Sequence, residues 1–297
     1  MSKLLTVLTP TYNRGKYLSR IYDSLKTQTN NNFKWVVVDD GSTDDTVKIF
    51  EDIEKDNSIL DISFYHKENG GKHTAINFAM PYVDSDLVLI LDSDDYLTND
   101  AVQLISDKWQ QYKNDTNICG FSFLKGRKID EPLTVWYPED EFVSNYIKFR
   151  IRKNIKGDCC EVIKTSVFKE FPFKEFHQEK FLTESSIWIP MAQKYDTVYI
   201  NKIIYVAEYL AGGLTKSGKK MQMNNPVGAM YAAKLGLDCK TRLSYKVKQA
   251  ILYGCYGFQT GSKSKTIIKN SGHSFLVALF IPVAYFFYKK WGKSIVV

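Results

Sequence analysis

The sequence predicts an α/β protein with a Rossmann-like, mostly parallel central sheet and flanking helices, followed by a basic helical region. Over the first hundred residues, short apolar runs alternate with amphipathic stretches, and a polar segment follows each apolar run. Such alternation gives parallel strands joined by crossover helices, and strands buried on both faces read as continuous apolar runs. The 297 residues are 44% hydrophobic and 25% charged, which excludes disordered and fibrous classes.

Each apolar run is expected to form a strand and each amphipathic stretch a helix. The expected strands are Leu4–Leu8, Phe33–Val38, Ile62–Tyr65, Leu87–Leu91 and Ile118–Leu124. The expected helices are Tyr17–Gln28, Asp44–Ile53, Lys72–Met80, Ala101–Tyr112 and Lys180–Gln193. A linker is expected at Gly261–Lys265.

Four polar segments come directly after the first four expected strands. They are Thr9–Arg14, Asp39–Ser42, His66–Gly71 and Asp92–Asp95. In open α/β sheets, ligands bind beyond the carboxyl ends of the strands. We therefore expect the functional site to be built from these four segments.

The last of these segments carries an Asp-x-Asp arrangement at a strand end. In an extended segment Asp92 and Asp94 point to one side, and carboxylate oxygens are the ligands that Mg²⁺ and Mn²⁺ prefer. A divalent ion held there can neutralise a leaving diphosphate. The alternative is that Asp92–Asp95 only caps the helix that follows.

The sequence resembles the inverting family-2 glycosyltransferases with the GT-A fold, over about residues 1–210. Short motifs carry the resemblance through their order and their place at successive strand ends. They are Thr9-Pro10-Thr11-Tyr12-Asn13-Arg14, Val37-Val38-Asp39-Asp40-Gly41-Ser42-Thr43-Asp44, Glu68-Asn69-Gly70-Gly71-Lys72, Leu91-Asp92-Ser93-Asp94-Asp95 and Leu182-Thr183-Glu184.

The resemblance implies a nucleotide-sugar donor. Tyr12 matches the position whose ring packs on the uracil, Asp40 the acceptor for the N3–H of that base, and Lys72 a cation near the diphosphate. Asp92 matches the ribose or metal position, and Asp94 the direct ligand of Mn²⁺ or Mg²⁺. The implied nucleotide-binding residues are Pro10, Tyr12, Asp40, Asn69, Lys72, Asp92 and Ser93. Taken alone, Tyr12 also fits a core aromatic, and Lys72 a solvated helix start.

Transfer with inversion also needs a base beside the acceptor hydroxyl. The family usually places this carboxylate in a Glu-Asp pair that opens a helix, whereas this chain has Thr183-Glu184. Alignment on Trp188 implies that Glu184 is the base. Glu179 and Asp158 are the reserve candidates, and Glu184 alternatively only complements the helix N-terminus.

The distribution of charge divides the chain. Residues 214–297 contain 14 Lys and Arg against the single acid Asp238, whereas residues 1–213 contain 26 basic and 32 acidic residues. We expect a nucleotide-sugar-binding half at 1–100, an acceptor-binding half at 101–213, and a basic, aromatic helical region at 214–297.

A 14-residue apolar and aromatic run, Phe275–Tyr288, lies in the basic region and is followed by two lysines. Because a membrane span needs about 20 apolar residues, the run predicts an interfacial helix on an anionic membrane surface. A homo-oligomer contact or a core-packing helix is the alternative. No nucleic-acid-binding module accompanies the basic residues, so a nucleic-acid partner is not expected.

Five cysteines without a C-x-x-C pair predict neither a disulfide framework nor a zinc site, which favours a reducing compartment. The first residues lack the apolar region of a signal peptide. The expected location is therefore the cytoplasm, peripheral on the inner face of the cell membrane.

These observations predict a metal-dependent, inverting glycosyltransferase that moves a sugar from a nucleotide-diphosphate donor, expected to be a UDP-sugar, to a hydroxyl of a glycan or lipid-linked acceptor. A sugar-nucleotide-forming nucleotidyltransferase is one alternative, but it would carry a Gly-rich, basic loop in place of Thr9–Arg14. An inactive sugar-binding or scaffold subunit is the other. It would be expected to lack Asp94 or Glu184, and both are present.

Overall fold

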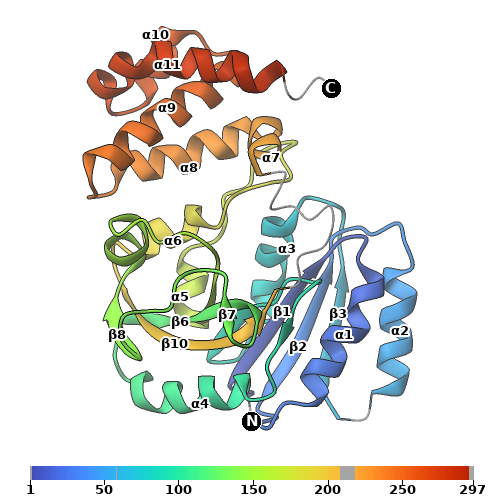
Figure 1. Ribbon diagram of the computed structural model, residues 1–297. Coiled ribbons are helices and arrows are strands. Elements are labelled where there is room, and N and C mark those ends of the chain that lie inside the picture. The colour runs from blue at the N-terminus through green and yellow to red at the C-terminus, as the bar shows by residue number, and fades with distance from the viewer. Residues whose placement is uncertain (1, 58, 208–217, 294–297) are drawn as a thin grey trace. The chain divides into compact units, whose positions relative to one another are not determined.

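A computed structural model describes residues 2–57, 59–207 and 218–293 (Figure 1). The chain forms two compact units, each made of three separate segments. The first unit comprises Met1–Asn145, Ile155–Pro172 and Lys194–Tyr209, and the second comprises Tyr146–Asn154, Phe173–Gln193 and Leu210–Val297. The boundary expected at residue 213 lies outside the described residues, and the division into 1–100, 101–213 and 214–297 stays a prediction.

The first unit is built on one mixed sheet with the strand order β3-β2-β1-β4-β9-β6-β10-β5. Its strands are β1 (Leu5–Thr11), β2 (Phe33–Asp39), β3 (Asp61–His66), β4 (Leu87–Ile90), β5 (Tyr96–Leu97), β6 (Ile118–Lys128), β7 (Glu131–Pro132), β8 (Glu141–Ser144), β9 (Cys159–Lys164) and β10 (Asp196–Val206). The strands β3, β2, β1 and β4 are parallel, as are β6 and β10, while β9 runs antiparallel between β4 and β6. The expected α/β architecture is confirmed.

Helices cover this sheet in the first unit (Figure 1). They are α1 (Gly15–Lys26), α2 (Thr46–Asp56), α3 (Lys72–Ala79), the 3₁₀ turn η1 (Met80–Tyr82), α4 (Ala101–Tyr112) and α5 (Thr165–Glu170). The core between sheet and helices is aromatic. Trp35 is fully buried, its Nε1 donates to Thr9 Oγ1 at 3.0 Å, and the Phe50 and Phe64 rings stack at 4.5 Å.

The second unit is helical. Its helices are the π-helical turn η2 (Ile147–Ile151), α6 (Ser185–Met191), α7 (Gly218–Asn224), α8 (Pro226–Asp238), α9 (Leu243–Gln259), α10 (Ser264–Asn270) and α11 (Ser274–Lys293). Helix α9 packs against both α8 and α11. A Cβ added to Gly254 of α9 would lie 2.7 Å from the Cβ of Ala284 in α11, so the glycine permits a very close approach of the two helices.

The expected helix over Lys180–Gln193 is wrong in extent, because only α6 is helical within it. The backbone amides of Lys180 and Phe181 instead donate to Asn225 Oδ1, at 2.7 and 3.2 Å, so this segment is held in a non-helical course. Pro190 lies near the end of α6, where its missing N–H weakens the helix. The linker expected at Gly261–Lys265 is a short turn, since α10 already begins at Ser264.

Helix α11 is longer than the apolar run that predicted it. It spans 20 residues. Among the described residues, it is the one helix whose length and composition would allow it to cross a membrane. The expectation that this segment is too short to span therefore does not hold on length alone.

Candidate active site

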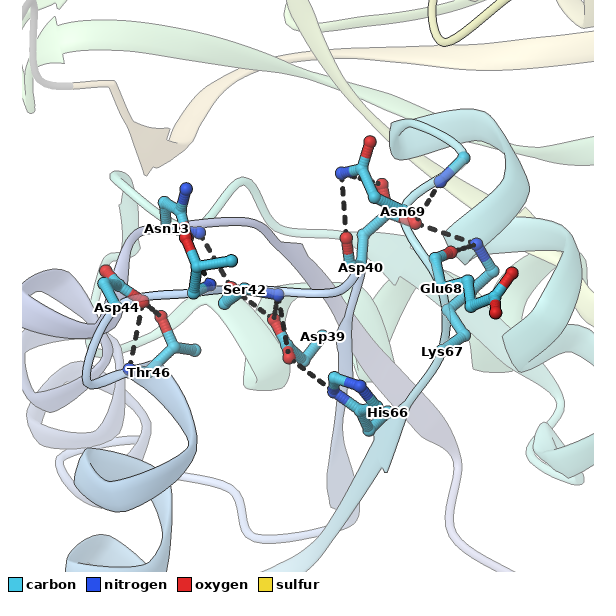
Figure 2. Close-up of polar contacts among 12 residues, drawn as sticks. Asn13, Asp39, Asp40, Ser42, Asp44, Thr46, His66, Lys67, Glu68 and Asn69 are labelled. Atoms are coloured by element: carbon cyan, nitrogen blue, oxygen red, sulfur yellow. Dashed lines mark hydrogen bonds and ion pairs between the residues drawn. The ribbon is translucent and has the colours of Figure 1, made fainter. Parts of the chain in front are cut away.

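The ends of β1, β2 and β3 bring three of the polar segments to one edge of the sheet. The parallel register places Thr11 opposite Asp39, and Asp39 opposite His66. Hydrogen bonds then join the segments that follow these strands. Asp40 N donates to Thr11 O at 2.8 Å. Asn13 N donates to Ser42 Oγ at 2.8 Å (Figure 2). The motifs at residues 9–14, 39–44 and 66–72 thus form one continuous surface.

Asp40 is buried, and four donors meet its carboxylate (Figure 2). Lys67 Nζ and the Gly70 amide donate to Oδ1, at 2.8 and 2.9 Å, and the Gly71 amide and Asn69 Nδ2 donate to Oδ2, at 2.6 and 3.2 Å. A carboxylate offers about four acceptor positions. In this arrangement Asp40 therefore holds the 67–71 loop, and a uracil N3–H would have to displace one of these donors. The role of Asp40 as a base-reading residue stays a prediction.

Two glycines make this loop arrangement possible. Gly41 has φ +78°, and a Cβ there would lie 2.8 Å from the Asn69 backbone nitrogen. Gly71, with φ +94°, directly precedes α3. Both positions adopt the left-handed region that a side chain disfavours. Glycine therefore lets the 40–42 and 67–71 segments approach closely, and it lets α3 begin at Lys72.

Asp39 stiffens the neighbouring turn. Its carboxylate is fully buried, it accepts hydrogen bonds from the backbone and hydroxyl of Ser42, and its Oδ2 lies 2.7 Å from His66 Nδ1 (Figure 2). Since Ser42 in turn accepts from the amide of Asn13, the segment that carries Tyr12 is tied to the turn after β2. The Tyr12 side chain is 47% exposed at the end of β1, so its ring is available to stack on a planar ligand.

A charged cluster lies at the end of β4. Asp92 Oδ1 is 2.5 Å from Lys72 Nζ, at the start of α3, and Asp92 Oδ2 is 3.7 Å from Lys125 Nζ on β6. Burial would raise the pKa of Asp92, but the two ammonium groups and the hydrogen bonds outweigh it and hold that pKa well below its ordinary value. Two cations therefore gather beside one carboxylate whose charged form they favour.

Tyr205 of β10 holds the segment Asp92–Asp95, which we call the acidic segment. Its hydroxyl donates to Asp95 Oδ2 at 2.7 Å and accepts from the Asp92 amide at 3.0 Å, and Lys125 Nζ lies 4.1 Å from the centre of its ring. Burial and the nearby Asp92 charge raise the pKa of Asp95 to about 7. On the other side, the Arg20 guanidinium donates to the backbone carbonyl of Asp94. The segment is thus fixed by groups from three other elements.

The residues at the end of β4 can supply part of the ligand set of the implied metal ion. Within the described ranges, no three His, Cys, Asp or Glu side chains come together as a metal-binding group. Mg²⁺ is, however, usually bound by one or two carboxylates together with substrate phosphates. The Asp94 side chain is partly exposed, and its carboxylate has no hydrogen bond or ion pair among the described residues. Asp94, with Asp92 beside it, can therefore supply protein ligands to an ion that a diphosphate completes.

The remaining expected nucleotide-binding residues, Pro10 and Ser93, lie at the same edge of the sheet. Pro10 is buried in β1, just past the last β1–β4 pair, Leu8 with Ile90, so its missing N–H interrupts no ladder there. Ser93 is buried between the two carboxylates. The structure thus brings all the expected nucleotide-binding and metal residues to one edge of the first unit.

The expected base belongs to the second unit. Glu184 is the residue that opens α6, and its carbonyl accepts from the amides of Ile187 and Trp188, at 3.0 and 3.2 Å. Its side chain is half-buried. Its position at the start of a helix agrees with the alignment on Trp188.

The two reserve candidates differ sharply. Both oxygens of Glu179 accept backbone amides at the start of α8, from Val227 at 2.7 Å and from Gly228 at 2.6 Å. Glu179 therefore satisfies a helix terminus. Asp158 is exposed and immediately precedes β9, which runs antiparallel to β4 and β6. It consequently lies at the sheet edge where those two strands end.

Two residues of the charged cluster were not predicted from the sequence. Lys125 follows directly after an expected strand, at the same kind of position as the acidic motifs, and that position was a usable signal. Tyr205 lies in β10, which was not predicted, although its apolar residues Val198–Ile200 and Ile203–Val206 are typical of a strand.

Known proteins share both the sequence pattern and the fold. GlyA of Streptococcus pneumoniae is 26% identical over 245 residues, which is 76% of this chain and 33% of GlyA. GlyG of the same organism is 32% identical over 41% of this chain and 40% of GlyG, and Staphylococcus aureus TarS, a poly(ribitol-phosphate) β-N-acetylglucosaminyltransferase, is 29% identical over 43% of this chain and 22% of TarS. The chain thus spans well under half the length of these relatives.

Solved structures extend the likeness to most of the chain. TarS 1-349 of S. aureus in complex with UDP-GlcNAc gives a TM-score of 0.61 at 20% identity, covering 90% of this chain and 75% of that one. The mannosyltransferase PcManGT of Pyrobaculum calidifontis, in complex with GDP-Man and Mn²⁺, gives 0.57 at 15% identity, covering 98% and 83%. These TM-scores indicate a common fold.

The family model for glycosyl transferase family 2 matches residues 6–171, which includes all the motifs of the donor-side edge. This match covers more than half of the chain, and it favours a family of sugar transferases over the nucleotidyltransferases. The chain belongs to glycosyl transferase family 2 and has the GT-A fold.

Proposed function

We propose that this protein transfers a sugar, with inversion, from a UDP-sugar to a hydroxyl group of a glycan or lipid-linked acceptor, and that it depends on Mn²⁺ or Mg²⁺. The observation that carries the proposal is the charged cluster at the end of β4, where Lys72, Lys125 and Asp92 gather next to Asp94. Such a cluster suits the diphosphate and ribose of a nucleotide sugar.

The donor would bind along the edge that the motifs form. The exposed Tyr12 ring would stack on the base, and the 67–71 loop, held by Asp40, would carry Lys72 to the diphosphate. An ammonium group that already faces a carboxylate can exchange that partner for a phosphate oxygen at little cost in charge. TarS in complex with UDP-GlcNAc supports a uridine nucleotide, since it shares this fold.

Asp94 would hold the divalent ion, with Asp92 as the second carboxylate. A bound ion would supply positive charge to the departing diphosphate. The complex of PcManGT with Mn²⁺ supports this assignment for the fold. Lys72 and Lys125 would share the same task, because both ammonium groups already lie at this carboxylate pair.

Glu184 would act as the base. It would take the proton from the acceptor hydroxyl, whose oxygen attacks the anomeric carbon while the bond from that carbon to the diphosphate oxygen breaks. The new glycosidic bond then lies on the face opposite the departing nucleoside diphosphate. Asp158 is the reserve that the structure favours over Glu179, because Glu179 is engaged at the start of α8.

The acceptor and the location are further parts of the proposal. TarS is named as a poly(ribitol-phosphate) β-N-acetylglucosaminyltransferase, which supports a hydroxyl-bearing polymer as the acceptor for this chain. Work on such an acceptor would take place at the cytoplasmic face of the cell membrane. A homo-oligomer is compatible with this activity.

A donor panel tests the proposal. Purified protein is incubated with UDP-, GDP- and dTDP-sugars, and release of the nucleoside diphosphate is measured with Mn²⁺, with Mg²⁺ and with a chelator. We expect release from one UDP-sugar, lost with the chelator and restored by the metal. Release from a GDP- or dTDP-sugar alone would overturn the donor assignment, and full release in the chelator would overturn the metal dependence.

A further inference from the structure

Helix α11 is apolar on both faces, and the described residues of the second unit cover one of them. Val277 and Ala284 are fully buried, and Ala284 lies against Gly254 of α9. Phe258 of α9 also meets Tyr285 and Tyr288 of α11, with ring centres at 5.2 and 5.8 Å. One side of α11 is therefore firmly packed on its own helical bundle.

The other side carries a row of exposed apolar side chains, which we call the α11 stripe. It consists of Phe275, Leu279, Val283 and Phe286, whose exposed fractions are 84%, 61%, 39% and 60%. Steps of four, four and three residues keep these side chains on one face of a helix. Large apolar side chains are rarely exposed as a contiguous row without a partner.

The charged residues of α10 and α11 are all basic. Lys289 and Lys290 follow the α11 stripe, and both are exposed, while Lys263, Lys265 and Lys269 are exposed on and just before α10. Asp238 is the last acid of the sequence, and its carboxylate is 2.8 Å from His273 Nε2. A second copy of the same surface would meet like charge, whereas an anionic lipid surface would meet opposite charge. The charge therefore favours lipid over self-association.

We propose that the α11 stripe docks on an anionic membrane, with α11 lying in the plane of the interface and still packed on α9. An apolar face flanked by lysines suits this position, because the side chains enter the acyl boundary while the ammonium groups meet phosphate headgroups. Crossing the membrane would require α11 to leave α9 and would expose the surface around Gly254 and Tyr253. The inference concerns the membrane as partner and is independent of which donor is used.

Vesicle flotation of the full chain tests the proposal. The probes are vesicles of phosphatidylcholine alone and of phosphatidylcholine with phosphatidylglycerol, without donor or metal. We expect binding to the anionic vesicles. The double variant Leu279→Glu/Phe286→Glu should lower the partition coefficient at least about tenfold, and Lys289→Ala/Lys290→Ala should lower it about fivefold per lysine.

The matched control is Ile59→Glu. Ile59 is 60% exposed, like Phe286, and lies in the first unit just before β3. This variant should bind as the wild type does, and circular dichroism should report a folded chain for all variants, since the changed positions are exposed. Equal loss of binding in Ile59→Glu would overturn the assignment to the stripe.

Two further results would contradict the proposal. Wild-type protein that resists an alkaline carbonate wash of the vesicles would be inserted across the bilayer, against the in-plane arrangement. Absence of vesicle binding together with a dimer that Leu279→Glu/Phe286→Glu separates would assign the stripe to a second copy. Since flotation needs no turnover, either outcome is independent of the donor-panel result.

Discussion

Tyr205 and Asp95 lie 110 positions apart in the sequence, and the phenol of Tyr205 donates a 2.7 Å hydrogen bond to Asp95 Oδ2. The Tyr205 hydroxyl oxygen also accepts a hydrogen bond from the Asp92 amide, at 3.0 Å. One side chain from β10 thus binds both ends of the acidic segment. The course of the backbone around Asp94 depends on it.

Tyr205→Phe should therefore weaken donor binding without removing a ligand. Loss of a buried phenol hydrogen bond costs about 1–2 kcal/mol of unfolding free energy, and a freer acidic segment should raise KM for the donor several-fold. Calorimetric titration with UDP and Mn²⁺ measures the binding, and chemical denaturation the stability.

The control for this change is Tyr195→Phe. It removes a 2.9 Å phenol hydrogen bond to Glu170, which lies in α5 and away from the acidic segment. It should leave KM unchanged. An equal rise of KM in both variants would show that general destabilisation, and no special role of Tyr205, causes the effect.

Asp94→Ala should abolish turnover and weaken metal-dependent binding of UDP, because a direct ligand is lost. Asp94→Asn should be nearly as poor, since the amide carries no charge. Asp61→Ala, an exposed acid at the start of β3, is the control and should keep full activity. Normal turnover of Asp94→Ala in chelator-treated buffer would refute the metal assignment.

Glu184→Gln should lower kcat by about 10²–10⁴-fold, because the amide keeps the shape but takes no proton. Donor affinity should stay near that of the wild type. Glu179→Gln should instead lower the melting temperature with little change in kcat, since Glu179 accepts the first amides of α8. If Glu184→Gln keeps its rate and Asp158→Asn loses it, the base is Asp158.

Asp40→Ala should destabilise the fold as well as weaken donor binding. Four donors lose their shared acceptor, and Lys67, whose side chain is only 17% exposed, loses its counter-ion. Removing one partner of a buried ion pair costs about 3–5 kcal/mol, and partial exposure of Lys67 places the loss at the lower end. Lys67→Ala in the same background should recover part of that stability, and additive losses would contradict the coupling.

Gly254→Ala should destabilise the helical unit, although alanine is the better helix former. The new Cβ would lie 2.7 Å from the Ala284 Cβ, and overpacking costs about 1–3 kcal/mol. Gly292→Ala in α11 meets no atom within 4 Å and should be neutral or stabilising. Thermal unfolding of both variants gives the comparison, and equal melting temperatures would contradict the close packing of α9 on α11.

The strand ends were predictable because a strand that is buried on both faces has a mainly apolar sequence. The runs that became β1, β2 and β4 are mainly apolar and buried, and the run that became β3 is shorter and partly exposed. The polar residues after all four runs could be recognised. The roles of individual residues at this edge of the sheet were harder to predict. Two of the four donors to Asp40 are glycine backbone amides. Every residue except proline has a backbone amide, so the residue type does not show which amides will donate.

Long-range partners escaped prediction for a different reason. Tyr205 and Lys125 reach the acidic segment because β9, β6 and β10 follow β4 in the order of the sheet. The order of strands in a mixed sheet cannot be predicted from the local pattern of apolar residues. Helix α6 was overextended because Asn225, more than forty residues away, holds the amides of Lys180 and Phe181.

The two units interleave along the chain, and this has a consequence for how the protein can be recombined. The short segments Tyr146–Asn154 and Phe173–Gln193 belong with the C-terminal helices, and Ile147, Ile151 and Ile189 share a buried cluster with Cys239. In a chimera with a relative, joined at a single point before α7, these isoleucines would pack against the helices of the relative and not against their own partners around Cys239. Exchange of the second unit between family members would thus have to graft three segments at once.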